Sequence, residues 1–475
     1  MEIIFLCFIL VLSFVLVKEK TVISLKWPLA YLILACAVSA QATEGPRDSY
    51  QNSDPGQRVP ANETANTVIE DIPKPDSIVE QVRTSTSEPK VNAIDTDTPA
   101  ASSMRAFTHP GILVTLKQLD FVKNHLDSEP WKSALDRVLK DPFARTDYVP
   151  TPWPKVECGS YSNPNLGCAD ETNDAGAAYT QAILWRLTGN MQYAENVRKI
   201  LNAWANTLSG GHTESNAPLQ AAWAAQLFTR AAEIVKYTYT GWPQPEKDRV
   251  TRMFATQYLP NIKSMFSGAY ACYNKNWHAS GIEAMANIGV FNKSTEIFDD
   301  AILKWKSLLP AYIYLGSDGS RPKNASWCFR SDAQISAHWY KPVAYVDGLS
   351  QETCRDFDHS AYGLAAIVNV AETARAQGLD LYHDKDTNAS RRITSAMELH
   401  SRYQNDLRRT KSRLCSKDKD VQGGTKGTFE IGYNQYAVRD GAQLPETERF
   451  LLNTRPTKGQ FHYLWETLTH GQIGL

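Results

Sequence analysis

Apolar side chains recur at steps of three and four residues through much of the chain after residue 173. One such stretch carries a single apolar stripe formed by Ala194, Val197, Leu201, Trp204 and Leu208. This spacing places side chains on one face of an α-helix, and the glycine pair at 210–211 is typical of a helix end. The sequence therefore predicts an amphipathic helix here.

The same spacing predicts helices over residues 174–187 and 219–239 and from about residue 246. Short breaks separate them, at Gly189 and at Gly241. Successive helical hairpins with alanine-rich faces are typical of bundles and solenoids of paired helices. We therefore expect an all-α fold, an incomplete (α/α) toroid or barrel of helical hairpins. The less regular stretch 312–347 is expected to be a long loop, and the segment after residue 425 carries aromatic residues without assignable elements.

The N-terminal part differs from the rest in composition. Two apolar runs, 1–17 and 27–40, are too short for a comfortable membrane span. The second run follows Lys26 and ends near Ala42, as in a signal peptide, so we expect residues 1–42 to be a signal or targeting region. The first run is either an upstream extension or a short anchor. Membrane contact is expected only through this segment, if it is uncleaved.

Residues 43–105 are rich in polar residues and proline and poor in large apolar residues, which predicts a disordered spacer. Residues 106–475 then form the folded toroid domain. The whole chain has 50 Lys+Arg and 51 Asp+Glu, without the clustered basic surface that nucleic-acid binding requires. We expect no nucleic-acid partner, and we expect a monomer.

Six cysteines follow the targeting region. An even number after an export signal favours disulfides over metal, and no CxxC pair offers zinc-type spacing. Cys158 and Cys168 are the expected pair, and the remaining four allow three complete pairings: Cys272, Cys328, Cys354 and Cys415. Four asparagines begin N-x-Ser/Thr sequons that would matter in a eukaryotic secretory route: Asn62, Asn292, Asn324 and Asn388.

The segment from residue 352 to 368 is the most informative for chemistry. If it is helical throughout, one face carries Glu352, Arg355, His359 and Tyr362, and the opposite face is apolar. The simpler interpretation is a solvated face with an Arg–Glu pair. A histidine and a tyrosine beside the arginine favour a functional face.

A second group precedes the helix predicted over 282–290. Asn276 and His278 would stand near its N-terminus, where backbone N–H groups favour a carboxylate. The alternative is that Asn276 caps the helix and His278 is a packed core residue. Trp277, Tyr273 and Trp327 could stack on sugar rings, although aromatic residues more often serve packing.

These motifs, with the run from Asn173 to Gly189 and the segment Gln377–Tyr382, resemble the alginate lyase superfamily of secreted polysaccharide lyases over about residues 107–390. The resemblance implies an (α/α) toroid with a central cleft, an anionic polysaccharide as partner, and secretion to an extracellular or periplasmic location. It also implies lytic cleavage of a uronic-acid polymer, of the alginate or glucuronan type, without a cofactor.

The resemblance implies a catalytic set as well. The family has an arginine followed seven residues later by a tyrosine, which Arg355 and Tyr362 match, and an asparagine close to a histidine, which Asn276 and His278 match less tightly. Related branches implicate a histidine at the position of His359, or a tyrosine of the preceding loop. The substrate-binding residues implied are Trp277, Tyr273, Asn173, Trp327, Tyr340 and Tyr345.

β-Elimination explains why these residue types are needed. The reaction removes the C5 proton of a uronate and expels the O4 oxygen, so negative charge builds on the carboxylate. Asn276 and Arg355 could stabilise that charge. His278 could take the proton, and Tyr362 could protonate the leaving oxygen or act as both base and acid.

Two other functions are compatible with the same sequence. A glycoside hydrolase on the same toroid would use two facing carboxylates, for which candidates are Asp174, Glu283, Asp356 and Asp358. A non-catalytic glycan-binding surface protein would retain the polymer without shortening it. A metal held by Asp356, Asp358 and His359 is not expected, because no HExxH or comparable signature is present.

Overall fold

Helices make up most of the computed structural model, which describes residues 105–159, 165–406, 414–415 and 421–475. The described residues belong to one compact unit. The predicted targeting region, nearly all of the predicted spacer and Asn62 lie outside the described residues, so those interpretations stay predictions.

The first half of the described chain contains seven α-helices and two very short strands. The helices are α3 (Leu116–Lys123), α4 (Trp131–Leu139), α5 (Cys168–Thr188), α6 (Met191–Thr207), α7 (Ala217–Thr238), α8 (Gln244–Met253) and α9 (Leu259–Ser264). The strands β1 (Val156–Glu157) and β2 (His212–Thr213) pair in parallel. A 3-10 turn, η1 (Pro142–Ala144), follows α4, and a π-helical turn, η2 (Phe254–Tyr258), joins α8 to α9.

The second half continues with 3-10 turns, further helices and one π-helical segment. In chain order these are η3 (Gly268–Tyr270), α10 (Lys275–Phe291), α11 (Thr295–Tyr312), η4 (Gly316–Asp318), α12 (Asp332–His338), α13 (Phe357–Ala376), α14 (Ala389–Asn405), α15 (Glu430–Tyr433), η6 (Asn434–Arg439), α16 (Pro445–Thr454) and α17 (Glu466–His470). The stretch predicted as a loop over 312–347 therefore contains only short helical pieces, and the unassigned C-terminal stretch is partly helical.

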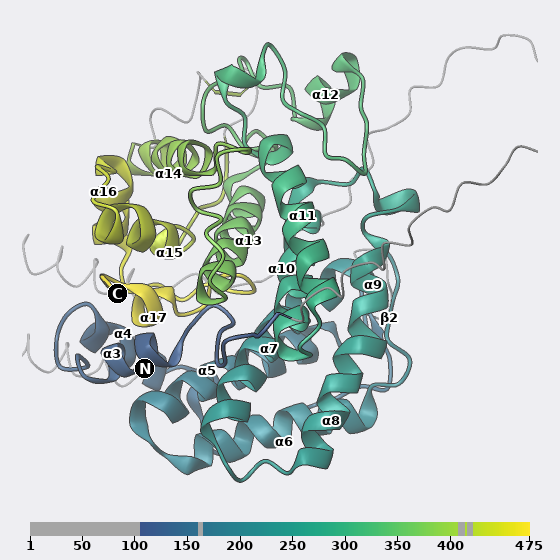
Figure 1. Cartoon of the computed structure of the whole chain (residues 1–475), viewed down its shortest axis with the longest axis vertical. Helices are drawn as coiled ribbons and strands as arrows, with labels where there is room; N and C mark the ends of the chain where they lie inside the picture. The colour runs from purple at the N-terminus through teal and green to yellow at the C-terminus, as the bar shows by residue number, and fades with distance from the viewer. Residues whose placement is uncertain (1–104, 160–164, 407–413, 416–420) are drawn as a thin grey trace, which may run out of the picture. The chain divides into compact units, whose positions relative to one another are not determined.

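The helices pack as successive neighbours. Helix α5 packs against α6 and α7, α7 packs against α10, and α10 packs against α11 and α13, while α14 packs against α16 (Figure 1). This arrangement confirms the predicted all-α fold of helical hairpins, an (α/α) toroid.

Helix α10 is the most deeply buried of these helices, since every one of its residues is buried. A helix that is apolar or small on all sides is typical of a core position. Gly289 shows how closely α11 approaches, because a Cβ atom there would stand 2.7 Å from the backbone nitrogen of Phe298. The C-terminal part of α10 therefore packs closely against α11.

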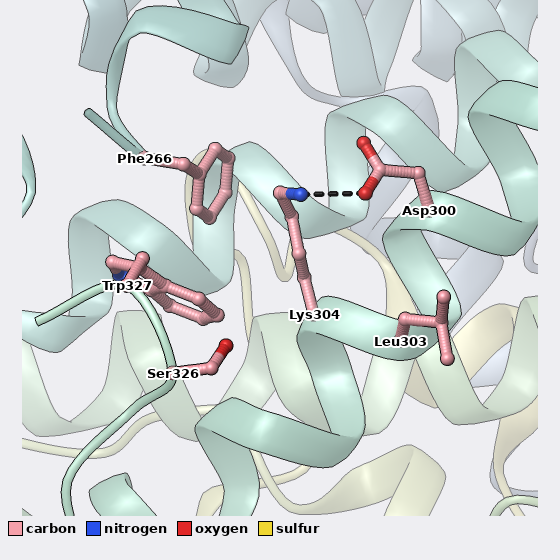
Figure 2. Close-up of a pocket in the computed structure, with 6 residues that line it drawn as sticks. All are labelled: Phe266, Asp300, Leu303, Lys304, Ser326 and Trp327. Atoms are coloured by element: carbon pink, nitrogen blue, oxygen red, sulfur yellow. Dashed lines mark hydrogen bonds and ion pairs between the residues drawn. The ribbon is translucent and has the colours of Figure 1, made fainter. Parts of the chain in front are cut away.

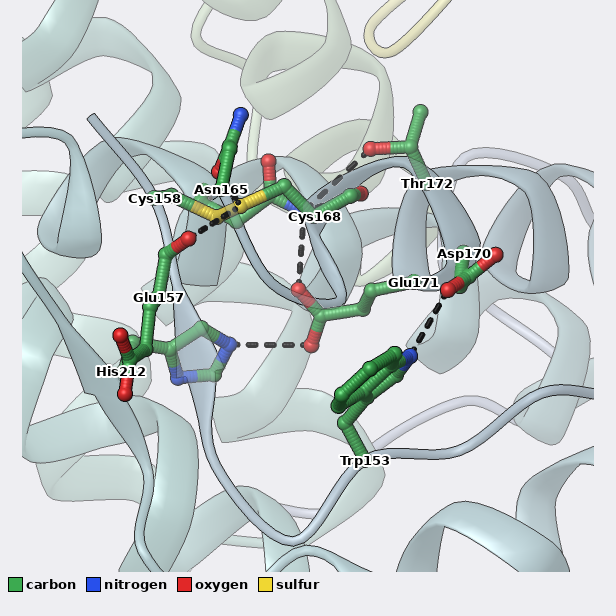
Figure 3. Close-up of a disulfide and its surroundings, with 10 residues drawn as sticks. Trp153, Glu157, Cys158, Asn165, Cys168, Asp170, Glu171, Thr172 and His212 are labelled. Atoms are coloured by element: carbon green, nitrogen blue, oxygen red, sulfur yellow. Dashed lines mark hydrogen bonds and ion pairs between the residues drawn. A yellow bond between two sulfur atoms is a disulfide. The ribbon is translucent and has the colours of Figure 1, made fainter. Parts of the chain in front are cut away.

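Three disulfides join irregular segments of the described chain, and one of them reaches the start of α5. Cys158 pairs with Cys168, which confirms the expected bridge, and the open pairings resolve as Cys272–Cys328 and Cys354–Cys415. Beside the first bridge, the buried Glu171 carboxylate contacts His212 at 2.9 Å, and Trp153 donates to Asp170 at 2.7 Å (Figure 3). The start of α5 is thus fixed by both covalent and polar contacts.

One helix boundary differs from the sequence prediction. Helix α13 begins at Phe357, because the Asp356 side chain caps it by accepting a hydrogen bond from the backbone N–H of His359. Glu352 and Arg355 lie in turns before the helix, so the prediction that all four polar residues share one helical face was wrong. The opposite face is buried along the helix, as the apolar spacing predicts.

The sequons within the described residues differ in their surroundings. The side-chain amides of Asn292 and Asn324 donate to the backbone carbonyls of Thr251 and Arg330, whereas Asn388 is exposed. Across the ranges that the structure describes, no helix has the length and apolar character needed to cross a bilayer. Within the same ranges, no cluster of three or more His, Cys, Asp or Glu side chains is arranged to hold a metal ion.

Candidate active site

The N-terminus of α10 is joined to the segment before α13 by one carboxylate. The backbone N–H of Asn276 donates to Glu352 Oε2 at 3.0 Å, and Asn276 Nδ2 donates to Glu352 Oε1 at 2.7 Å. Both residues are buried. Asn276 Oδ1 has no hydrogen-bond partner among the described residues. The asparagine is therefore oriented by Glu352 and retains an unused polar atom.

The same carboxylate also holds Arg355. Arg355 Nη1 donates to Glu352 Oε1 at 3.0 Å. Burial raises the pKa of Glu352, and the opposing charge of Arg355 favours its ionised form. Because one buried carboxylate binds both side chains, Asn276 and Arg355 form a single unit at the helix start.

His359 is oriented by a neighbouring acid. Its Nδ1 lies 2.7 Å from the Asp356 carboxylate, which also accepts the His359 backbone N–H at 2.7 Å. Although burial alone would raise the pKa of Asp356, the hydrogen bond and charge of His359 hold it below its usual range. With Nδ1 directed to Asp356, Nε2 is the nitrogen left for a ligand or a proton.

Tyr362 lies one helical turn beyond His359, with ring centroids 5.9 Å apart. Its hydroxyl oxygen accepts a hydrogen bond of 2.5 Å from Gln460 Nε2. The ring packs beside Phe461 and Tyr463 of the C-terminal segment. The structure therefore brings His359 and Tyr362 together on the first turns of α13, next to Arg355.

The two loop tyrosines predicted to bind substrate differ in their contacts. Tyr340 belongs to this region, since its hydroxyl oxygen accepts from Asn274 Nδ2 at 2.8 Å. Burial, together with the charge of Glu352, raises the pKa of Tyr340 to about 12. Tyr345 packs with Tyr314 and Trp339 in a small core, against which Tyr340 also packs.

His278 faces a different side of α10. Its Nε2 lies 3.0 Å from the Met265 carbonyl oxygen, and its ring contacts Phe266 and Trp327. Complete burial and the nearby charge of Lys275 hold its pKa well below the ordinary value. The rings that His278 contacts differ from those of Phe461 and Tyr463 that pack beside Tyr362.

Trp327 lines a pocket on that same side, with a volume of about 200 Å³. Figure 2 shows its lining residues, which are Phe266, Asp300, Leu303, Lys304, Ser326 and Trp327. Its charged groups form an ion pair, with Lys304 Nζ 2.5 Å from Asp300 Oδ1. None of the predicted catalytic residues lines this pocket.

The other predicted binding residues lie on α5 and at or just before the start of α10. Trp277 is 2% exposed and stacks on Tyr270, so it serves packing. Tyr273 is 42% exposed, and Asn173 is an exposed residue of α5. The sequence did not single out Gln460 as part of the site, and it assigned no catalytic or binding role to Glu352. The i,i+3 spacing of Glu352 and Arg355 signals their pairing, whereas no local pattern marks Gln460.

The carboxylates considered for a hydrolase are occupied by structural contacts. Asp174 accepts from Tyr148, Trp204 and the backbone of Thr151. Asp358 accepts from the backbone N–H of Gly424. Glu283 contacts Arg230, and Asp356 contacts His359. Such contacts are typical of structural carboxylates rather than of a hydrolytic pair.

A buried chain of Ser280, His462 and Glu283 has the spacing of a nucleophile, base and acid. Ser280 Oγ lies 2.8 Å from His462 Nε2, and His462 Nδ1 lies 2.7 Å from Glu283 Oε2. However, all three side chains are buried, and Ser280 Oγ donates to the backbone of its own helix. This closed chain joins the C-terminal segment to α10 and has no access for a substrate.

Comparison with solved structures shows the fold independently. A tyrosine-to-phenylalanine variant of alginate lyase A1-III complexed with a tetrasaccharide is 18% identical, with a TM-score of 0.53 over 76% of this chain and 95% of that chain. The apo form of a histidine-to-alanine variant of the same enzyme is 19% identical, with a TM-score of 0.54 over the same shares, 76% and 95%. No curated protein sequence matches the chain.

The family comparison covers the segments that carry most of the candidate site. The sequence profile described as Alginate lyase matches residues 127–409, more than half of the chain. The match includes the start of α10 and the start of α13, and it ends before the segment that carries Gln460. The chain therefore belongs to the alginate lyase family and is a polysaccharide lyase.

Proposed function

We propose that this polysaccharide lyase cleaves a uronic-acid polymer of the alginate type by β-elimination at the start of α13. One observation carries the proposal: Asn276 and Arg355 are bound to a single buried carboxylate, beside His359 and Tyr362. This group combines donors for a uronate carboxylate with two side chains able to exchange protons.

Each side chain has a role in the proposed reaction. Arg355 and the second N–H of the Asn276 amide donate to the uronate carboxylate and stabilise the charge that develops on it. His359 Nε2 takes the C5 proton, while the C4–O4 bond breaks and the C4=C5 double bond forms. Tyr362 gives its proton to the departing O4 oxygen. Asp356 stabilises the resulting imidazolium, since it already contacts Nδ1.

The contacts favour His359 over His278 as the base. His359 has an acid on one nitrogen and stands beside Tyr362, whereas His278 is bound to a backbone carbonyl among aromatic rings. His278 in this role stays a prediction from the sequence. The matched separation of Arg355 and Tyr362 supports the tyrosine as the acid.

We also propose that the enzyme is exported. All six cysteines of the folded part are paired in the structure, and stable disulfides are typical of oxidising compartments. The apolar runs of the N-terminal sequence supply the corresponding targeting signal.

The function is tested by incubating residues 43–475 with polymannuronate, polyguluronate, glucuronan and hyaluronan. We expect ultraviolet absorbance from unsaturated ends on at least one alginate block, with product masses lower by one water than those of hydrolysis. Saturated ends would establish a hydrolase instead. Polymer that is retained but never shortened would indicate a glycan-binding protein.

A further inference from the structure

The C-terminal segment 459–466 makes a polar contact with Tyr362 near the start of α13. Gln460 Nε2 donates to the hydroxyl oxygen of Tyr362 at 2.5 Å. Both side chains are half-buried. Because the amide occupies one lone pair of the phenol oxygen, the hydroxyl proton must point elsewhere.

This segment is anchored by buried contacts of the residues that follow Gln460. The His462 ring is held by Glu283 and Ser280 of α10, and its carbonyl oxygen accepts from Asn369 Nδ2 of α13 at 2.7 Å. Further along, Trp465 Nε1 donates to Thr180 Oγ1 of α5 at 2.7 Å. Gln460 is therefore carried by a segment fixed to three core helices.

Aromatic rings fix the phenol that Gln460 contacts. Tyr463 stacks on the Tyr362 ring at 6.1 Å between centroids, and Phe461 meets it edge-on at 5.7 Å. Phe461 in turn stacks on Trp223 of α7 at 3.9 Å. The Tyr362 hydroxyl is thus held in position by its ring neighbours and in orientation by Gln460.

We propose that Gln460 is a positioning residue for Tyr362, and that segment 459–466 completes the catalytic centre from outside the part of the chain matched to the family. This inference rests on the proposed function for its kinetic consequence. An N–H donated to the phenol oxygen stabilises the negative charge that appears there when the proton leaves.

The test compares Gln460→Met, which removes the donor at similar length, with Gln460→Glu, which places a carboxylate against the phenol oxygen. Gln244→Met is the matched control, since Gln244 donates to Asp248 on the exposed surface of α8. For each protein, kcat and KM are measured from ultraviolet absorbance, and folding is measured by urea denaturation. The ionisation of Tyr362 is followed by NMR of ¹³Cζ-labelled tyrosine, with Tyr362→Phe identifying the signal.

We expect Gln460→Met to lower kcat by about tenfold to a hundredfold, with little change in KM, because the lost bond is to a charge-bearing oxygen. The pH at which Tyr362 ionises should rise in Gln460→Met and rise further in Gln460→Glu. The control should match the wild type in both measurements. An unchanged ionisation midpoint in both Gln460 variants would overturn the inference, whether or not kcat falls.

The two proposals fail in different ways. A wild-type protein that releases no unsaturated product from any uronate polymer contradicts the proposed function, while the NMR titration still decides the role of Gln460. A wild-type lyase whose Gln460→Met variant keeps full kcat and the original midpoint contradicts only the positioning role.

Discussion

Two clusters of the same residue types differ in what they leave accessible. Each cluster combines a buried glutamate with an arginine, a histidine and an asparagine: the first contains Glu352, Arg355, His359 and Asn276, and the second contains Glu283, Arg230, His462 and Asn369. We call them the open cluster and the closed cluster.

The difference lies in exposure and in the second nitrogen of each histidine. The Arg355 side chain is 12% exposed and that of Arg230 is 0% exposed. In the closed cluster, Ser280 Oγ contacts His462 Nε2. Beside the open cluster, Asp356 contacts His359 through Nδ1. Residue types therefore do not identify a catalytic centre by themselves, and accessible polar atoms distinguish it from a structural network.

The largest effect is expected at Tyr362. Tyr362→Phe keeps the ring that packs against Phe461 and Tyr463 but removes the hydroxyl group. Loss of a correctly placed acid costs ~10² to 10⁴ in rate, and we expect the upper part of this range with little change in stability. Initial rates of ultraviolet absorbance measure it. A rate within tenfold of the wild type would show that Tyr362 is not the acid of the reaction.

The closed cluster should respond in stability. Glu283→Ala leaves the buried Arg230 without its carboxylate, and breaking a buried ion pair from one side costs about 3 to 5 kcal/mol. Urea denaturation measures the free energy of unfolding. Asp248→Ala on the exposed face of α8 is the control and should change it by less than about 0.5 kcal/mol. Equal stability of the two variants would remove the distinction between the clusters.

The pH dependence of folding should also reflect the burial of the Glu466 carboxyl group. Burial raises the pKa of Glu466 to about 7, above the value of about 4.3 expected in the unfolded chain. Between these values only the folded state keeps the proton, so this carboxyl destabilises folding progressively as the pH rises from about 4.5 to 7.

The corresponding variant is Glu466→Gln. The free energy of unfolding of the variant minus that of the wild type should be larger at pH 8 than at pH 4.5. The expected increase in this difference is about 3 kcal/mol. Urea denaturation at both pH values checks this difference. A wild-type protein and a variant with parallel pH profiles would contradict the shifted pKa.

A smaller effect is expected at Asp356. Asp356→Asn preserves a capping side chain for α13 but removes the charge that orients His359. We expect kcat to fall by about tenfold to a hundredfold, as for other partners that orient a functional histidine, with stability changed by less than about 1 kcal/mol. Kinetics and urea denaturation of the same preparation separate the two. A loss of stability without a loss of kcat would leave Asp356 a cap only.

The sequence predicted much of the fold because the evidence for helices is local. The apolar stripe of Ala194–Leu208 and the break at Gly210 mark α6, which ends at Thr207. The pair Cys158–Cys168 was predictable because only a short loop separates the two cysteines. The pairings of Cys272 and Cys354 depend on how distant segments fold, and spacing alone did not resolve them.

The site was predictable only in part. Tyr362 and His359 lie one turn apart, so helical periodicity groups them. Glu352 and Arg355 lie off that helix because the cap at Asp356 starts a new element, and sequence spacing extended the helix across it. The contact between Gln460 and Tyr362 joins positions 98 residues apart through an irregular segment without periodicity. Such a contact exists only in the folded chain.

The identity of the catalytic base is tested most directly by comparing variants of two histidines in one assay. Initial rates of unsaturated product on alginate are measured for His359→Gln and His278→Gln, each corrected for the folded fraction. With His359 as the base, we expect a loss of at least about a hundredfold for His359→Gln and a rate within about threefold of the wild type for His278→Gln. The reverse order would rule out His359 as the base and would assign proton abstraction to His278.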